Sequence, residues 1–394
     1  MKNIIGFMFV VGLAGCQMLE QEFPTPAACE LQQAIKEDHS YAGELTTLLD
    51  SFVQAGLPGA VIAISNEEGD WAGAAGLASI EEEIPMQACM AQHGFSISKT
   101  MFSALCMRLW DQGLIDLDVP IAGYLPAEIA EQVSDHEKIT VRMLLNHTSG
   151  IPEFHDDLGR ISEYLQDPVK RRSREELLGY VREKPLHFEP GTDWAYSNTN
   201  YLLLTWVIEE ASGKDHALVM KEQLLDPLGL SHTWYKVQPG YPDALALPNY
   251  YWDRYSKGIL ENCSEANLNI GAWSGFGEDG VIATPLDFVH FMQALAEGKV
   301  VSEAAWAEMT QWVQGSQSAE PDYGLGLVWV NFGGGVHEFG HYGGGVGGIC
   351  VLIYLPEQKT SVYVATNAGA ITGGEYAHLA YTFINRIPAV IAER

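Results

Sequence analysis

The sequence predicts an α+β protein in which one antiparallel sheet is assembled from strands near both ends of the chain and is flanked by helices. Two observations give this prediction. Short apolar segments that are typical of strands occur at residues 59–79 and again after Pro321. Between them, from about residue 113 to 315, the patterns are mostly helical. We therefore expect a single domain over residues 41–394 with an α-rich subdomain inserted into it.

The first elements of the domain are a helix and a hairpin. Apolar residues between Leu45 and Val53 follow helical spacing, and the pattern ends before Gly56. The segments Gly59–Ser65 and Trp71–Ser79 flank a polar turn, which predicts two antiparallel strands.

A second helix begins close to Ser96. Its apolar stripe is formed by Phe102, Leu105, Cys106 and Leu109, and Gly113 ends it. Further along the helical middle of the chain, two N-terminal capping signals resemble capping boxes: Ser173 with Glu176, and Thr284-Pro285 with Asp287.

The last part of the chain returns to strands. The segments Tyr323–Asn331, Gly348–Leu355 and Thr360–Asn367 are short, apolar and rich in Val and Ile. Residues Glu375–Ile391 then predict a closing helix.

Charge and composition exclude several classes of protein. The 394 residues include 22 Lys+Arg against 51 Asp+Glu, a formal net charge of -29. Such a surface repels nucleic acid and anionic lipid headgroups, so we expect no nucleic-acid partner. Apolar residues make up 47%, which fits an ordinary folded protein and excludes wholesale disorder.

The N-terminus resembles the signal of a bacterial lipoprotein. An apolar stretch over residues 4–13 is too short to span a membrane, and it is followed by Leu13-Ala14-Gly15-Cys16, which resembles a lipobox. We expect residues 1–15 to be a signal peptide, Cys16 to be lipidated and residues 16–40 to form a tether. The lipid would then be the only contact with the membrane, in the bacterial periplasm, and Gln17 favours the outer membrane. The alternative is an ordinary signal peptide with a chance cysteine.

The other cysteines lack the spacing of a metal site. Cys106 and Cys350 lie in apolar patterns and are expected in the core. Cys29, Cys89 and Cys263 can supply one disulfide, and the sequence does not choose the pair.

Ser96 and Lys99 suggest nucleophilic catalysis. Residues three apart share one face of a helix, so the amine of Lys99 can reach the hydroxyl of Ser96. A serine hydroxyl becomes a good nucleophile when a neighbouring base takes its proton. The helix start adds free backbone N–H groups that favour developing negative charge.

Two further motifs follow in order. Tyr196-Ser197-Asn198 precedes a helix in the middle of the chain, and His341-Tyr342-Gly343 lies beside the final strands, where glycine lets a substrate approach the backbone closely. With Phe95-Ser96-Ile97-Ser98-Lys99-Thr100, these motifs make the chain, from about residue 45 to 390, similar to the serine β-lactamase-related family. That family includes class C β-lactamases, D-alanyl-D-alanine carboxypeptidases, D-amino-acid peptidases and related esterases. The resemblance implies the β-lactamase/transpeptidase-like fold.

The resemblance also implies roles for the catalytic residues. Ser96 would be the acylated nucleophile, Lys99 the base that activates it, and Tyr196 would share the proton with Lys99. For this role the pKa of Lys99 must fall by roughly three units from about 10.4, through burial and cationic neighbours.

The substrate would be held by the other motif residues. By the same resemblance, Asn198 would bind the substrate amide, and His341 would take the electrostatic role that Lys has in the lactamases. Gly343 and Gly344 would contact the substrate, and the backbone N–H groups of Ser96 and Gly344 would form the oxyanion hole.

The resemblance predicts an acyl-enzyme hydrolase of amides or esters, with D-amino-acid peptides as the leading substrate class, as in a D,D-carboxypeptidase. The alternatives are a carboxylesterase on the same site and a non-catalytic lipoprotein that binds peptidoglycan or β-lactams. Tyr342 replaces a small residue of the strand motif, and a histidine charge depends on pH, so efficient β-lactam hydrolysis is disfavoured. Neither a cofactor nor a deacylating carboxylate is assigned.

Several patterns suggest other chemistry. His337-Glu338-Phe339-Gly340-His341 fits the zinc peptidase motif, but that site needs a helix, and the surrounding glycines argue against one, so no metal is expected. The glycine motif at residues 275–280 is interpreted as a turn rather than a dinucleotide site. His147 is expected to be structural, and Trp194 and Trp273 either line the cleft or pack.

Overall fold

The computed structural model describes residues 25–31, 34–242, 244–268, 275–316, 323–330, 338–369 and 374–393. Within these residues the main sheet has seven antiparallel strands in the order β3-β2-β1-β12-β11-β10-β9. Their bounds are β1 Gly59–Asn66, β2 Gly69–Ser79, β3 Ile84–Pro85, β9 Val328–Val330, β10 Glu338–Gly345, β11 Gly348–Leu355 and β12 Thr360–Thr366. Because β1 pairs with β12, the two ends of the chain share one sheet, which confirms the predicted fold class.

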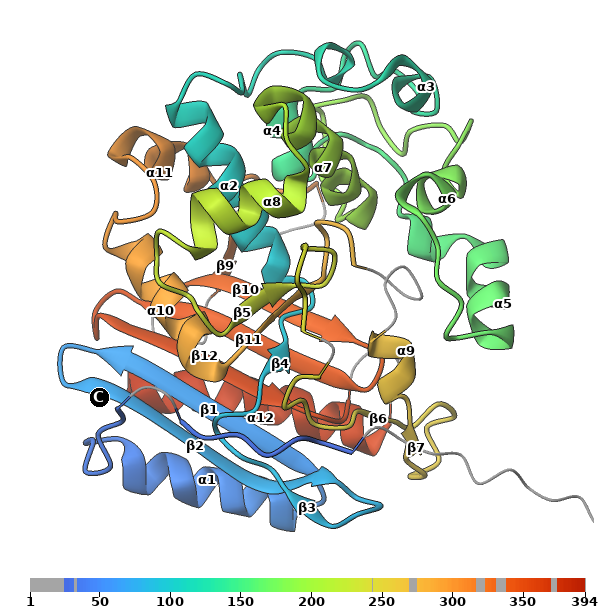
Figure 1. Cartoon of the computed structure of the whole chain (residues 1–394). Helices are drawn as coiled ribbons and strands as arrows, with labels where there is room; N and C mark the ends of the chain where they lie inside the picture. Colours follow the sequence, from blue (N-terminus) through green and yellow to red (C-terminus); the bar gives the residue numbers. More distant parts are fainter. Residues whose placement is uncertain are drawn as a thin grey trace, which may run out of the picture.

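Helices cover both faces of this sheet. On one face lie α1 (Ala42–Gln54) and α12 (Glu375–Ala392), and on the other lie α2 (Ile97–Asp111) and α10 (Pro285–Ala296) (Figure 1). Strand β1 serves both layers, since Ile62 and Ile64 belong to the core beneath α1 and α12, while Val61 and Ala63 belong to the larger core. A strand buried on both faces reads as a continuous apolar run rather than an alternating one.

The middle of the chain is mostly helical, as expected, but it also contains short strands. The helices are α3 Ala127–Ala130, α4 Val141–Leu145, α5 Leu158–Gln166, α6 Arg174–Gly179, α7 Asn198–Ser212, α8 His216–Met220, α9 Ser264–Leu268 and α11 Glu303–Met309. The strands are β4 Gln92–His93, β5 Thr233–Tyr235, β6 Tyr251–Trp252, β7 Glu261–Asn262 and β8 Val281–Ala283. The capping box of Ser173 and Glu176 forms at α6, and the Thr284 side chain caps α10.

One expectation for the late strands is corrected. Of Tyr323–Asn331, only Val328–Val330 is a strand within the described residues, because Gly326 takes a left-handed φ of 68° that interrupts the extended chain. The His341 motif lies in strand β10, in agreement with the strand motif that it resembles, although the glycines of β10 have low strand propensity. This strand forms because β11 supplies a complete antiparallel partner over residues 339–345.

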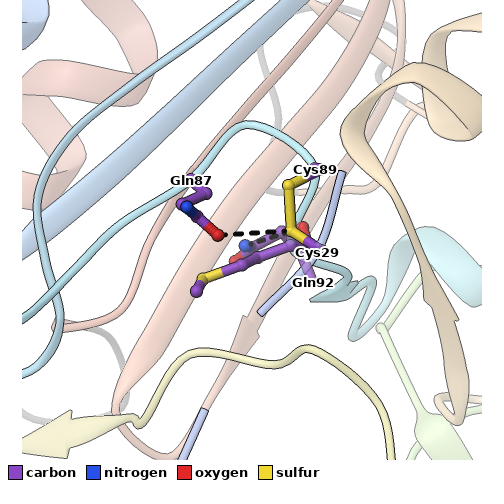
Figure 2. Close-up of a disulfide and its surroundings, with 5 residues drawn as sticks. Cys29, Gln87, Cys89 and Gln92 are labelled. Atoms are coloured by element: carbon purple, nitrogen blue, oxygen red, sulfur yellow. Dashed lines mark hydrogen bonds between the residues drawn. A yellow bond between two sulfur atoms is a disulfide. The ribbon is translucent and has the colours of Figure 1, made fainter. Parts of the chain in front are cut away.

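The N-terminal segment is fastened to the domain by a disulfide between Cys29 and Cys89, which lies beside Gln87 and Gln92 (Figure 2). This resolves the pairing that the sequence left open, and Cys263 is free. Cys106 and Cys350 are buried, as predicted. Residues 1–15 and Cys16 lie outside the described residues. Of the helices that are described, none combines the length and apolarity that a membrane span requires.

Candidate active site

Ser96 lies at the N-terminus of α2, beside strand β10. The preceding Phe95 has a positive φ of 45°, and its ring packs so closely on β10 that a Cβ at Gly345 would lie 2.2 Å from it. A Cβ at Gly343 would similarly meet the carbonyl oxygen of Gly94 at 2.4 Å. The glycines of β10 therefore allow the start of α2 to lie directly against the sheet, which places Ser96 beside the His341 motif.

Lys99 is fully buried one turn into α2 and makes three polar contacts. Its Nζ lies 3.0 Å from Ser96 Oγ, 2.6 Å from Asn198 Oδ1 and 2.8 Å from the carbonyl oxygen of Glu278. Burial lowers the pKa of Lys99 to about 8, while the negative charges of Glu278 and Glu153 act in the opposite direction. Part of the Lys99 population is therefore neutral near pH 7, and only the neutral amine can act as a base.

The three contacts orient the lone pair of the neutral amine. Carbonyl and amide oxygens only accept hydrogen bonds. The two hydrogens of a neutral Lys99 amine are therefore directed at Asn198 Oδ1 and at the Glu278 carbonyl, which leaves the lone pair facing Ser96 Oγ. In this state the Ser96 hydroxyl donates to Lys99, which is the geometry that proton removal requires.

Tyr196 stands over the same amine. The Lys99 Nζ lies 4.9 Å from the centroid of the Tyr196 ring. Burial raises the pKa of Tyr196 well above 10, although a hydrogen bond with Ser96 opposes this shift. The phenol is therefore neutral at pH 7 and can donate or relay a proton, while Lys99 is the group that can accept one at this pH.

Two glutamates that the sequence did not point to, Glu153 and Glu278, hold the residues and backbone that contact Lys99. Glu153 accepts hydrogen bonds from the backbone N–H of Asn198 at 2.5 Å and from its Nδ2 at 2.9 Å, so the amide oxygen of Asn198 is turned toward Lys99. Glu278 accepts from the backbone N–H groups of Gly275 and Phe276, and burial raises its pKa to about 8. Residues 275–280 thus form a bend, as predicted, whose carbonyl reaches Lys99.

The structure corrects the charge expected at His341. Its Nδ1 contacts the carbonyl oxygen of Tyr342 at 2.5 Å, and its Nε2 contacts the hydroxyl of Tyr323 at 2.9 Å. Because a carbonyl only accepts, Nδ1 carries the hydrogen and Nε2 accepts from Tyr323. Burial and the charge of Lys99 lower the pKa of His341 to about 3, so the ring is neutral at pH 7 rather than positively charged. No sequence signal pointed to Tyr323.

A cavity of about 330 Å³ opens in front of Ser96. Gly343 and Gly344 line it, and Trp194 does so too, which answers the question left open for that residue; Trp273 lies outside the described residues. The other lining residues are Tyr196, Tyr323, Val328, His341, Tyr342, Ile349 and Tyr381. The cavity is therefore mainly aromatic.

His147 and the zinc motif have structural explanations. His147 is buried and its Nδ1 accepts hydrogen bonds from the backbone N–H of Ser197 at 3.2 Å and from Nδ2 of Asn200 at 3.0 Å, so it braces the Tyr196 loop. Residues 338–341 lie in strand β10, which does not provide the helical spacing that a His-Glu-x-x-His zinc site needs; His337 lies outside the described residues.

The fold and the site together define a class of protein. A serine at a helix start, paired with a buried lysine and a tyrosine beside the edge of an antiparallel sheet, is the arrangement of a serine hydrolase. The beta-lactamase family model matches residues 32–381, and the chain therefore belongs to this family of serine hydrolases, as its motifs suggested.

Known relatives agree with this membership. Penicillin-binding protein 4* of Bacillus subtilis is 28% identical over 302 residues, which are 74% of this chain and 64% of that protein, just under two thirds of its length. The D-alanyl-D-alanine-carboxypeptidase/endopeptidase AmpH of Escherichia coli is 26% identical over 290 residues, 70% of this chain and 71% of that protein.

Solved structures also match. A D-stereospecific amidohydrolase from Streptomyces is 28% identical with a TM-score of 0.70, covering 83% of this chain and 94% of that one. The D-amino acid amidase from Ochrobactrum anthropi has a TM-score of 0.76 at 21% identity, covering 89% and 98% of the two chains, which supports the fold alone.

Proposed function

We propose that this protein hydrolyses amides and peptides of D-amino acids through an acyl-enzyme on Ser96. The observation that carries the proposal is the contact of 3.0 Å between Ser96 Oγ and the buried amine of Lys99. Relatives named as a D-stereospecific amidohydrolase and as a D-alanyl-D-alanine-carboxypeptidase support the substrate class.

In the acylation step, Ser96 Oγ attacks the substrate carbonyl carbon and its proton passes to the neutral amine of Lys99. The charge that develops on the carbonyl oxygen is stabilised by the backbone N–H groups of Ser96 and Gly344, and Gly344 lines the same cavity. One such donor is worth about 3 to 4 kcal/mol in the transition state.

The intermediate then collapses. The bond between the carbonyl carbon and the leaving nitrogen breaks, and that nitrogen receives the proton held by Lys99, directly or through the Tyr196 phenol. Deacylation reverses these roles: a water molecule attacks the ester, gives its proton to neutral Lys99, and Ser96 recovers a proton as its bond to the acyl group breaks. Asn198, fixed by Glu153 through its Nδ2, accepts from Lys99 through its Oδ1 and is therefore positioned to orient the base.

The experiment compares hydrolysis of D-phenylalanine amide, L-phenylalanine amide and a p-nitrophenyl ester by the wild type, Ser96→Ala and Ser98→Ala. We expect faster turnover of the D-amide than of the L-amide, an acyl adduct of the wild type by intact mass, and loss of both in Ser96→Ala. Ser98→Ala, two residues along the same helix, should still form the adduct. Rapid ester turnover with no amide turnover would support the carboxylesterase alternative instead. Binding without any adduct would support the non-catalytic alternative.

We further propose that the mature protein begins at Cys16 and is held by lipid at a bacterial membrane in the periplasm, most simply the outer membrane. Support comes from the lipobox-like Leu13-Ala14-Gly15-Cys16 and from the Cys29–Cys89 disulfide, which fits an oxidising compartment. Metabolic labelling with an alkyne fatty acid should mark the wild type and not Cys16→Ser. Equal labelling of the two would contradict the proposal.

A further inference from the structure

We infer that the substrates carry no carboxylate beside the scissile bond, so that the enzyme takes amides, internal peptide bonds or neutral esters rather than peptides whose leaving residue ends in a free carboxylate. The inference rests on the proposed function, because it concerns the groups next to the carbonyl that Ser96 attacks. It distinguishes an amidase or endopeptidase from a carboxypeptidase or β-lactamase.

The cavity offers a carboxylate no positive partner. Among its described lining residues there is no Lys, Arg, Asp or Glu, and five side chains are aromatic: Trp194, Tyr196, Tyr323, Tyr342 and Tyr381. The negative faces of aromatic rings attract apolar groups and cations rather than anions. A carboxylate that leaves water for such a cavity loses hydration without gaining an ion pair.

His341 does not supply the missing charge or a free donor. Both of its ring nitrogens are engaged, Nδ1 with the carbonyl of Tyr342 and Nε2 with the hydroxyl of Tyr323. Its lowered pKa, about 3, agrees with a neutral ring. A substrate carboxylate that approaches His341 therefore meets neither a cation nor an unoccupied N–H.

Lys99 does not provide a cation for a substrate carboxylate either, because its amine already contacts three other groups. Its Nζ is directed at Ser96, Asn198 and the Glu278 carbonyl, and the residue is fully buried. The carboxyl groups of Glu153 and Glu278 act electrostatically on Lys99, and in their ionised form they add negative charge that disfavours a bound carboxylate. The formal net charge of -29 disfavours an anionic ligand further.

The sequence extends this conclusion to segments outside the described residues. The stretches 269–274, 317–322, 331–337 and 370–373 contain no Lys or Arg. No Lys or Arg from any of these four stretches can therefore compensate a carboxylate in the cavity. Amidation of the leaving residue removes that cost, because a carboxamide is neutral and can both donate and accept hydrogen bonds.

The test uses two peptides that differ in one group: N-acetyl-D-Phe-D-Ala as the free acid and as the C-terminal amide. The carboxylate of the leaving D-Ala is two covalent bonds from the scissile nitrogen, so it must lie beside the reacting carbonyl. We expect kcat/KM for the amide to exceed that for the acid by roughly 10- to 100-fold at pH 7, the loss that follows from one uncompensated charged group. An acid cleaved as fast as the amide, or faster, overturns the inference.

A matched pair of variants tests the electrostatic cause. Tyr381 lines the cavity from α12 and is 47% exposed, so it can be changed with little risk to folding. In Tyr381→Lys the ratio of amide to acid should fall by about tenfold or more, whereas in Tyr381→Gln, which removes the same ring without adding charge, it should stay near the wild-type value. Equal ratios in the two variants would contradict a charge-based preference.

Ser96→Ala separates this inference from the proposed function. If the acid is preferred and Ser96→Ala abolishes turnover, the substrate preference is wrong and the proposed nucleophile stands. If turnover of either peptide survives in Ser96→Ala, the proposed function fails, and the inference fails with it.

Discussion

The lowered pKa of Lys99 gives a quantitative prediction for the pH dependence of Ser96 acylation. With a pKa of about 8, roughly one Lys99 amine in eleven is neutral at pH 7, and nearly all are neutral at pH 9.5. With the ordinary value of 10.5, only about one in 3,000 would be neutral at pH 7. The buried site therefore increases the reactive fraction at pH 7 by roughly 300-fold.

The assay measures the second-order rate constant for labelling of Ser96 by a fluorophosphonate between pH 6 and 10.5. We expect the rate to rise by about tenfold from pH 7 to pH 9 and then to level off, because the neutral form of Lys99 is the base. A rate that still rises about fivefold between pH 9.5 and pH 10.5 would refute the reasoning, since that is the rise expected for an amine with the ordinary pKa of 10.5.

Two variants identify the group that titrates. Lys99→Met should slow labelling by roughly 10²- to 10⁴-fold and remove the inflection. Glu278 has a pKa of about 8 as well, so the inflection belongs to the pair. In Glu278→Gln the inflection should persist and move to lower pH, because the carboxylate charge raises the pKa of Lys99. Loss of the inflection in Glu278→Gln would assign it to the glutamate instead.

The remaining predictions concern the supports of the site. Glu153→Gln should move the same inflection to lower pH, since the Glu153 charge also raises the pKa of the base; an unchanged profile would contradict this. Gly326→Ala should lower the free energy of unfolding, measured with urea, by at least about 2 kcal/mol, because its Cβ would lie 2.4 Å from a neighbouring side chain. The control Gly213→Ala has a similar φ but open space around it, so it should lower the free energy of unfolding by only about 1 kcal/mol. Reduction of the Cys29–Cys89 disulfide, which closes a separation of 60 residues, should cost about 4 kcal/mol by loop-closure entropy, and a calorimetric melting temperature that does not fall would exclude it.

Local patterns in the sequence were sufficient for much of the fold. The apolar spacing in α1 and α2, the hairpin of β1 and β2, and the capping box at α6 all depend on residues within a few positions of one another. The same locality placed Ser96 and Lys99 on one helical face. Apolar periodicity did not predict strand β10. Its glycines have low strand propensity, and they adopt a strand because β11 is paired beside them.

The sequence by itself determined the order of the elements and which residue types could perform the chemistry, because helical and strand periodicities are short-range properties of the chain. Only the tertiary structure decided which side chains surround those residues and how the surroundings change their protonation. The pKa of Lys99 depends on burial and on Glu278 and Glu153, and the neutral state of His341 depends on burial and on the charge of Lys99. Charge interactions and desolvation act through space between segments far apart in the chain, and no local pattern encodes them.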